Sequence, residues 1–164
     1  MKESVKVKGI WTITARDADG NIIAQDTWEN LVTDEGLNYL LDAGLADGTQ
    51  IDTWYVGLTA ASPSAAAADT LASHSGWTEV TAYDGDRKAW TPGSVSGKSV
   101  SNSGNAAQFE ISTNSTTIGG AFLASAASGT SGKLYAAGAF SGGNIVLNSG
   151  STLDVTATFT TAAA

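Results

Sequence analysis

Short runs in which apolar and polar residues alternate, separated by turns rich in Gly and Ser, constrain the fold of this chain most strongly. The clearest run is LDVTATFT, where Leu153, Val155, Ala157 and Phe159 alternate with Asp and Thr. This alternation is typical of an antiparallel strand with one buried face. Similar short runs recur along the chain, among them TWYVGL, AAQFEIS, TTIGGAFLAS, KLYAAGAFS and NIVLN. We therefore predict a mainly β protein with an antiparallel β-sandwich or jelly-roll-like fold.

The segment at residues 33–43 is an exception, because it carries the signals of a helix. Thr33 is a suitable N-cap, and two acidic residues follow it in the expected first turn. Leu37, Leu40 and Leu41 have the i, i+3, i+4 spacing of one helical face. We expect one principal α-helix at about residues 33–43, whose leucine stripe packs on the sheet and closes its open end. The alternative is a helix that contacts a partner. A short second helix is expected within the loop AASPSAAAADTLASHSG.

Length and composition limit the classes of protein to which this chain can belong. Its 164 residues predict a single domain, residues 1–164, in which residues 1–8 form an N-terminal arm. The net charge of −8 argues against a nucleic-acid partner, because neutralising phosphates requires clustered Lys and Arg. No long apolar window indicates a membrane span, and the first residues lack the apolar core of a signal peptide. We expect a protein that folds in a cytosol, and the lack of cysteine excludes disulfides.

Two features each contain some of the residues of a known site, one a catalytic triad and the other a calcium loop, but neither has the complete motif. His74 is the single histidine, and no serine lies in a GxSxG turn, so an acyl-transfer triad is not indicated. The sequence DADGN places Asp17, Asp19 and Asn21 as in the opening of a calcium loop, but Trp28 stands where that loop needs Glu. A hairpin turn accounts for DADGN better. We expect no enzymatic activity and no catalytic, cofactor-binding or metal-binding residues.

The tryptophans allow two interpretations. Exposed, coplanar rings would form a sugar platform, as in β-sandwich carbohydrate-binding modules. In small β proteins, tryptophans more often lie in the core or at protein–protein interfaces, and we favour that interpretation. The five positions are Trp11, Trp28, Trp54, Trp77 and Trp90.

The N-terminal sequence MKESVKVKG gathers lysines in an otherwise acidic chain. Lys2, Lys6 and Lys8 are three of its six lysines, and Lys6 and Lys8 alternate with Val5 and Val7. A strand here would have one cationic and one apolar face. One interpretation is that the lysines protect an outer strand from pairing with other sheets. The other is that they dock the chain to a neighbouring subunit or to an acidic capsid surface.

The order of several segments resembles a family of small tailed-bacteriophage proteins that are similar to capsid decoration, or cement, proteins. These segments include NLVTDEGLNYLLD, TWYVGLT, GWTEVTAYD, RKAW, TIGGAFLAS, GTSGKLYAAGAFS and LDVTATFT, and the resemblance covers roughly residues 9–160. It implies a structural protein, made in the bacterial host cytoplasm, that binds the major capsid protein on the outer surface of the virion and stabilises the assembled head. It also implies a homo-oligomer, either a trimer or a dimer, with no cofactor and neither a nucleic-acid nor a membrane partner. The alternative is a carbohydrate- or receptor-binding β-module of a head fibre or tail.

Overall fold

The computed structural model describes residues 4–163 and confirms an antiparallel β-sandwich with one principal helix, α1 (Asp34–Leu45). The helix signals at residues 33–43 therefore predicted this element correctly. The strands in chain order are β1 (Val5–Arg16), β2 (Ile22–Val32), β3 (Trp54–Thr59), β4 (Glu79–Val80), β5 (Lys88–Trp90), β6 (Ser99–Ser101), β7 (Ala107–Glu110), β8 (Thr116–Ile118), β9 (Gly120–Ala124), β10 (Leu134–Ala139), β11 (Ile145–Leu147) and β12 (Thr152–Ala163).

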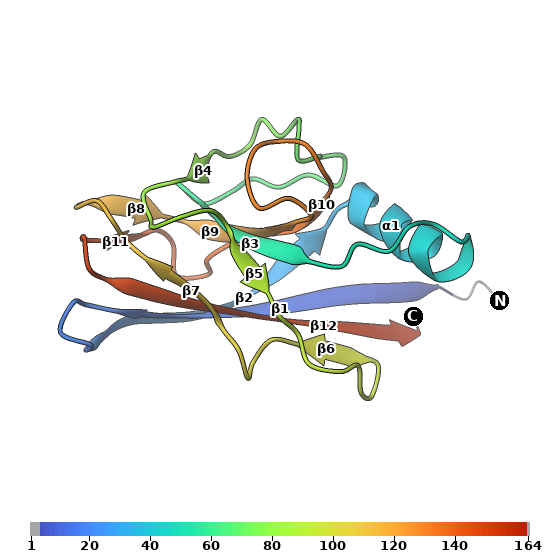
Figure 1. Ribbon diagram of the computed structural model, residues 1–164, viewed down its shortest axis with the longest axis horizontal. Helices are drawn as coiled ribbons and strands as arrows, with labels where there is room; N and C mark the ends of the chain where they lie inside the picture. Colours follow the sequence, from blue (N-terminus) through green and yellow to red (C-terminus); the bar gives the residue numbers. More distant parts are fainter. Residues whose placement is uncertain (1–3, 164) are drawn as a thin grey trace.

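Strand β2 connects the two layers of the sandwich. Residues Ile22–Asn30 of β2 pair with β1, which in turn pairs with β12 along its whole length, and β6 and β7 also pair with β12. The last two residues of β2, Leu31 and Val32, pair instead with β10, followed by β9, β3 and β4, while β5 pairs with β3. Figure 1 shows β1 and β12 forming one layer and β3, β9 and β10 the other. A single bending strand thus contributes to both layers.

The core lies between these layers and follows the alternation of the sequence. On β1, Trp11 and Ile13 are fully buried, and on β12 the inward residues Leu153 and Val155 are fully buried as well. Val56 of β3 faces the same cluster from the other layer. Complete burial of a large apolar side chain contributes about 1.5–3 kcal/mol relative to exposure, so these alternating positions supply much of the driving force for folding. The inward positions predicted in LDVTATFT are confirmed.

The loop between β3 and β4 covers the outer face of the second layer. Leu71 and Trp77 of this loop are buried, and they form a second apolar cluster with Phe122 of β9 and Leu134 of β10. The prediction of a short helix in this loop is wrong, since it contains only turns and a short bridge between Thr70 and Ser73. Packing of these two large side chains on the sheet outweighs the helix preference of the alanines.

A buried ion pair fastens the loop between β9 and β10. The Arg87 guanidinium donates to both oxygens of Glu79, at 2.7 and 2.6 Å. It also donates to the carbonyls of Ala126 and Gly129, at 2.9 and 2.8 Å, and lies 5.1 Å from the ring centre of Phe122. Four of the five N–H groups of this fork-shaped side chain therefore donate, two to Glu79 and two to carbonyls of the loop.

Candidate docking surface

Helix α1 is attached to β10 through its first turn. Thr33 caps the helix, because its hydroxyl oxygen accepts from the Gly36 N–H at 3.1 Å and its hydroxyl donates to the carbonyl of Leu134. The carboxylate of Glu35 accepts from the Leu134 N–H at 2.6 Å. Gly36 lies directly on the backbone of Tyr135, where a β-carbon would come within 2.4 Å of the carbonyl oxygen. Only glycine permits this close approach of helix and strand.

Beyond this turn, Tyr39 is the large side chain that anchors α1. Tyr39 is 9% exposed, and its ring lies edge-on to Trp54 with 5.1 Å between ring centres. Its hydroxyl oxygen accepts from the Ile51 N–H at 2.9 Å, which fixes the chain that follows the helix. Ala43, one turn further on, packs at the edge of the same core. The stripe that faces the sandwich is therefore Gly36, Tyr39 and Ala43.

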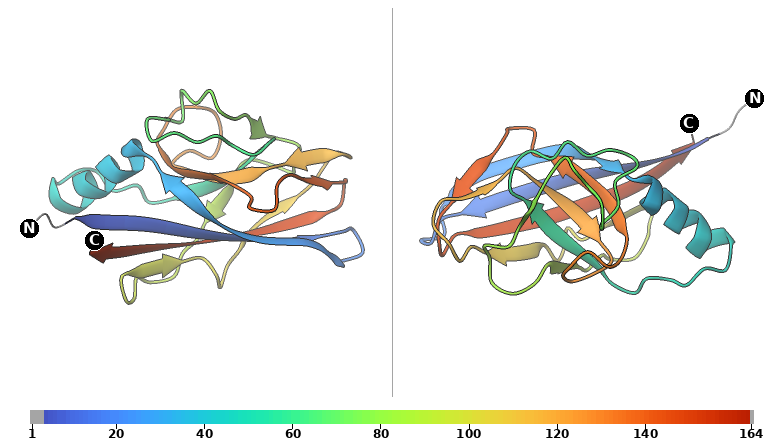
Figure 2. Two further views of the ribbon diagram at one scale, coloured as in Figure 1. Left: turned by 180° about the vertical axis from the view of Figure 1, so that it is seen from behind. Right: turned by 90° about the horizontal axis from the view of Figure 1, so that it is seen from above.

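The leucines of α1 are exposed, so the prediction that their stripe packs on the sheet is wrong. Leu37 and Leu40 are each 38% exposed, and Leu41 and Leu45 are 59% and 85% exposed. The helical spacing was recognised correctly, but the stripe that docks begins one residue earlier, which rotates it by about 100° around the helix. Figure 2 shows α1 extending past the end of the sandwich. Consequently the helix presents an apolar face to its surroundings.

The first four residues of β1 form a free strand edge at the same end of the molecule. Val5–Lys8 pair with residues 160–163 of β12, and together these segments are called the ribbon tip. On the other side of β1, pairing with β2 begins only at Gly9, because β2 bends into the second layer after Asn30. Within residues 4–163, no strand pairs with this side of Val5–Lys8. Figures 1 and 2 show the ribbon tip beside α1.

The structure describes two of the three lysines that were predicted either to protect this strand or to dock it to a partner. Lys2 lies outside the described residues. Lys6 and Lys8 are exposed, and Lys8 lies 2.5 Å from Glu29 of β2. Strand β1 is central over Gly9–Arg16, so the expectation of an outer strand holds only for its first four residues. Edge protection and docking both remain compatible with these positions.

An apolar cavity of about 140 Å³ lies between α1 and the core. Tyr39 and Leu40 form its helical side, and Phe159 of β12 lines the side toward the ribbon. The remaining lining residues are Trp54, Trp90, Val100, Leu123 and Tyr135. Burial raises the pKa of the Tyr135 hydroxyl from its ordinary value of 10 to about 12. The cavity, the exposed leucines of α1 and the ribbon tip are together called the docking surface.

The tryptophans do not form an exposed platform. Trp11, Trp28, Trp77 and Trp90 are each less than 10% exposed, and Trp54 is half-buried between Tyr39 and Tyr135. The interpretation of these residues as core is therefore confirmed. Sequence alone gives no indication of the end cavity, because its walls come from eight residues on seven different elements.

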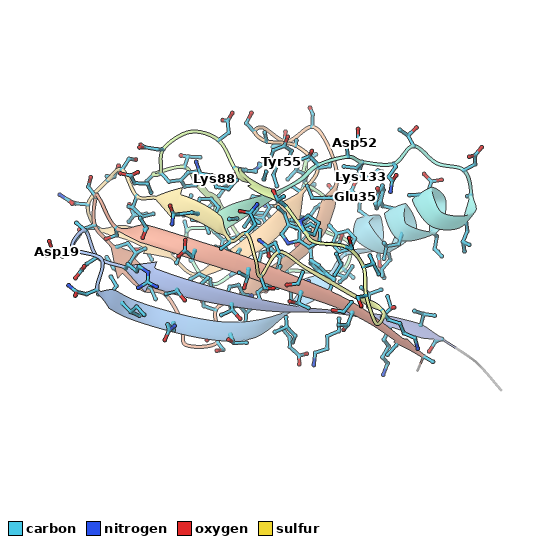
Figure 3. The ribbon with its side chains drawn as sticks, turned by 60° about the horizontal axis from the view of Figure 1, so that its bottom comes forward. Asp19, Glu35, Asp52, Tyr55, Lys88 and Lys133 are labelled. Atoms are coloured by element: carbon cyan, nitrogen blue, oxygen red, sulfur yellow. The ribbon has the colours of Figure 1, made fainter. Side chains whose placement is uncertain are left out.

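The DADGN segment forms a hairpin turn, as expected. The Asp17 carboxylate accepts from the N–H groups of Asp19 and Asn21 and from the Asn21 side-chain amide. The Asn21 amide is the main cause that lowers the pKa of Asp17. Asp19 lies at the far end of the molecule from α1 (Figure 3). The carboxylate oxygens of Asp17 thus already accept hydrogen bonds from donors within the turn itself.

His74 does not meet the partners of a catalytic triad. Its ring stacks on Trp77 with 3.6 Å between ring centres, and Nδ1 contacts the Trp77 carbonyl oxygen at 3.2 Å. Across residues 4–163, no group of three His, Cys, Asp or Glu side chains is arranged to hold a metal ion. In the same part of the chain, no helix has the length and apolar character needed to cross a membrane.

A scan against protein-family models and a search of curated proteins find no match to this chain. The resemblance to phage decoration proteins therefore stays a prediction from the sequence.

Proposed function

We propose that this chain is a non-enzymatic structural protein of a bacteriophage virion, a capsid decoration or cement protein that binds the outside of the assembled head. The observation that carries the proposal is the docking surface, where α1, which carries four exposed leucines, lies beside a free strand edge at one end of the sandwich. Contiguous exposed apolar side chains on a small protein are typical of sites that contact other macromolecules. The resemblance of the sequence supports the phage assignment.

In this function the protein acts by binding and performs no reaction. Its partner is the major capsid protein, and a ligand that binds only the assembled shell stabilises that shell relative to its separated parts. A homo-oligomer, either a trimer or a dimer, multiplies the contacts, because attachment at one point raises the effective concentration at the next. The net charge of −8 favours a protein partner over nucleic acid or an anionic membrane.

The alternative is a carbohydrate- or receptor-binding module, and the arrangement of the tryptophans does not favour it. A sugar platform requires exposed and coplanar aromatic rings, whereas four of the five tryptophans are buried. The apolar surface of α1 is aliphatic and fits a protein partner better than a sugar.

The copy number of this chain in purified phage particles tests the proposal. Quantitative mass spectrometry of particles that have been washed free of unassembled protein should find hundreds of copies per particle. A decoration protein must occupy many equivalent sites on the shell, so a handful of copies would indicate a fibre or tail component instead. Absence from the particles would contradict any role in the virion.

A further inference from the structure

We propose that the free edge of β1 at Val5–Lys8 receives an extended segment of the capsid partner in which apolar and acidic residues alternate. This inference rests on the proposed function and names the chemistry of the segment that is bound. Three features of the ribbon tip carry it, namely its open backbone, its inner face and its outer face.

The backbone of the ribbon tip is extended, and the hydrogen-bonding groups on one of its sides face no strand of the described chain. Strand β12 holds Val5–Lys8 from the other side through continuous antiparallel pairing, which keeps the four residues extended. Since the N–H and C=O groups of alternate residues point to the same side of a strand, about two of these four residues present both groups to the open edge. An added strand would satisfy these groups, as in other complexes formed by strand addition.

The inner face of the ribbon tip selects apolar residues. Val5 and Val7 point to the same side as Trp11, toward the interior of the sandwich. Val7 packs against the core, whereas Val5 is 73% exposed because nothing in the described chain covers it. Leu40 borders the end cavity nearby. Inward side chains of an added strand would therefore cover Val5 and extend toward the cavity that Leu40 lines.

The outer face of the ribbon tip selects acidic residues. Lys6 and Lys8 point outward, and Lys6 makes no ion pair with residues 4–163. Lys8 is already paired with Glu29, which shows that a carboxylate on a neighbouring strand can reach this row. An acidic residue of the added strand opposite Lys6 would repeat that arrangement, and opposite charges across adjacent strands are stabilising.

The same charges argue against a second copy of this chain at the edge. When two identical strands pair antiparallel about a twofold axis, residues on the same face lie opposite each other. Lysines would then face lysines across the new pair, and like charges in that position are destabilising. The lysines thus disfavour self-pairing and favour an acidic strand, so edge protection and docking are compatible roles of the same residues.

Nuclear magnetic resonance with model peptides tests this inference on the intact chain. The probe is a capped octapeptide of alternating Val and Glu, and the control peptide alternates Val and Lys. The Glu peptide should shift the backbone amides of Val5–Lys8 and slow their hydrogen exchange, whereas the Lys peptide should not. Lys6→Glu should weaken binding of the Glu peptide about fivefold or more by reversing one charge pair. The matched control is Lys133→Glu, which changes the net charge equally at an exposed lysine near Glu35, away from the ribbon (Figure 3).

Three results would overturn the inference. The first is an absence of shifts at Val5–Lys8 with the Glu peptide. The second is equal binding of the two peptides, or equal weakening by Lys6→Glu and Lys133→Glu. The third is concentration-dependent protection of the same amides without peptide, which would show that a second copy occupies the edge. None of these results bears on the copy number in phage particles, so failure here is distinguishable from failure of the proposed function.

Discussion

Tyr39 and Leu41 lie two residues apart on α1, and their substitution should have opposite consequences for stability. The leucine spacing in the sequence predicts that Leu41 is a core residue. In the structure Tyr39 is 9% exposed and Leu41 is 59% exposed. We therefore expect Tyr39→Ala to destabilise the fold strongly and Leu41→Gln to have almost no effect.

The magnitudes follow from the contacts of each side chain. Tyr39→Ala removes a buried aromatic ring, its edge contact with Trp54 and the acceptor for the Ile51 N–H, which together cost about 3 kcal/mol. For a domain of 164 residues, this corresponds to a melting temperature lower by roughly 6–12 °C. Leu41→Gln keeps a good helix former at an exposed site, so its effect should stay within about 0.5 kcal/mol.

Thermal unfolding followed by circular dichroism, together with urea titration, measures both variants. Tyr39→Phe serves as an intermediate, since it keeps the ring and loses only the hydroxyl, at a cost of about 1 kcal/mol. If Leu41→Gln proves as destabilising as Tyr39→Ala, the leucine face is buried in solution. The docking surface as described would then not exist.

Three further outcomes are expected from the rest of the structure. Arg87→Met should lower the free energy of unfolding by about 3 kcal/mol in urea titrations, because Glu79 loses its partner at a largely buried site, and adding Glu79→Leu should recover part of the loss. Stability should decline as pH rises from about 10 toward 12, because the folded pKa of Tyr135 exceeds its unfolded value. Tyr135→Phe should reduce that decline without abolishing it, since burial also raises the pKa of Tyr83. Calcium or a chelator should leave the melting temperature unchanged, because Asp17 already accepts its hydrogen bonds within the turn; a drop with chelator that calcium restores would contradict this.

The strands could be predicted from the sequence because each is encoded by its own residues. Alternation of Leu153 and Val155 with polar neighbours identifies both β12 and its buried face. The Thr33 cap likewise identifies where α1 begins. These signals are local, and a segment adopts its locally preferred structure in the folded chain when tertiary packing favours the same structure.

The docking surface could not be predicted because it depends on where other elements end. Nothing within Leu37–Leu41 indicates that the first turn of α1 attaches to β10, or that Tyr39 takes the core position. Similarly, Val5–Lys8 have the alternation of an ordinary strand, and they become an edge only because β2 turns away after Asn30. The lysine pattern indicated a special role for this segment, but its open side is visible only in the pairing of the strands.

Binding of purified chain to bare phage capsids tests most directly whether the docking surface attaches the protein. One variant combines Leu37→Gln, Leu41→Gln and Leu45→Gln on α1. The matched control makes the same change at three other exposed apolar residues, on strands at the opposite end of the sandwich. These residues are Ile22, Ile23 and Val146.

Occupancy is measured by co-sedimentation, at a temperature where all three proteins are folded. The parent and the control variant should saturate the capsid at similar concentrations, and the α1 variant should lose most of its occupancy. Full occupancy by the α1 variant, or equal loss in both variants, would contradict attachment through the docking surface.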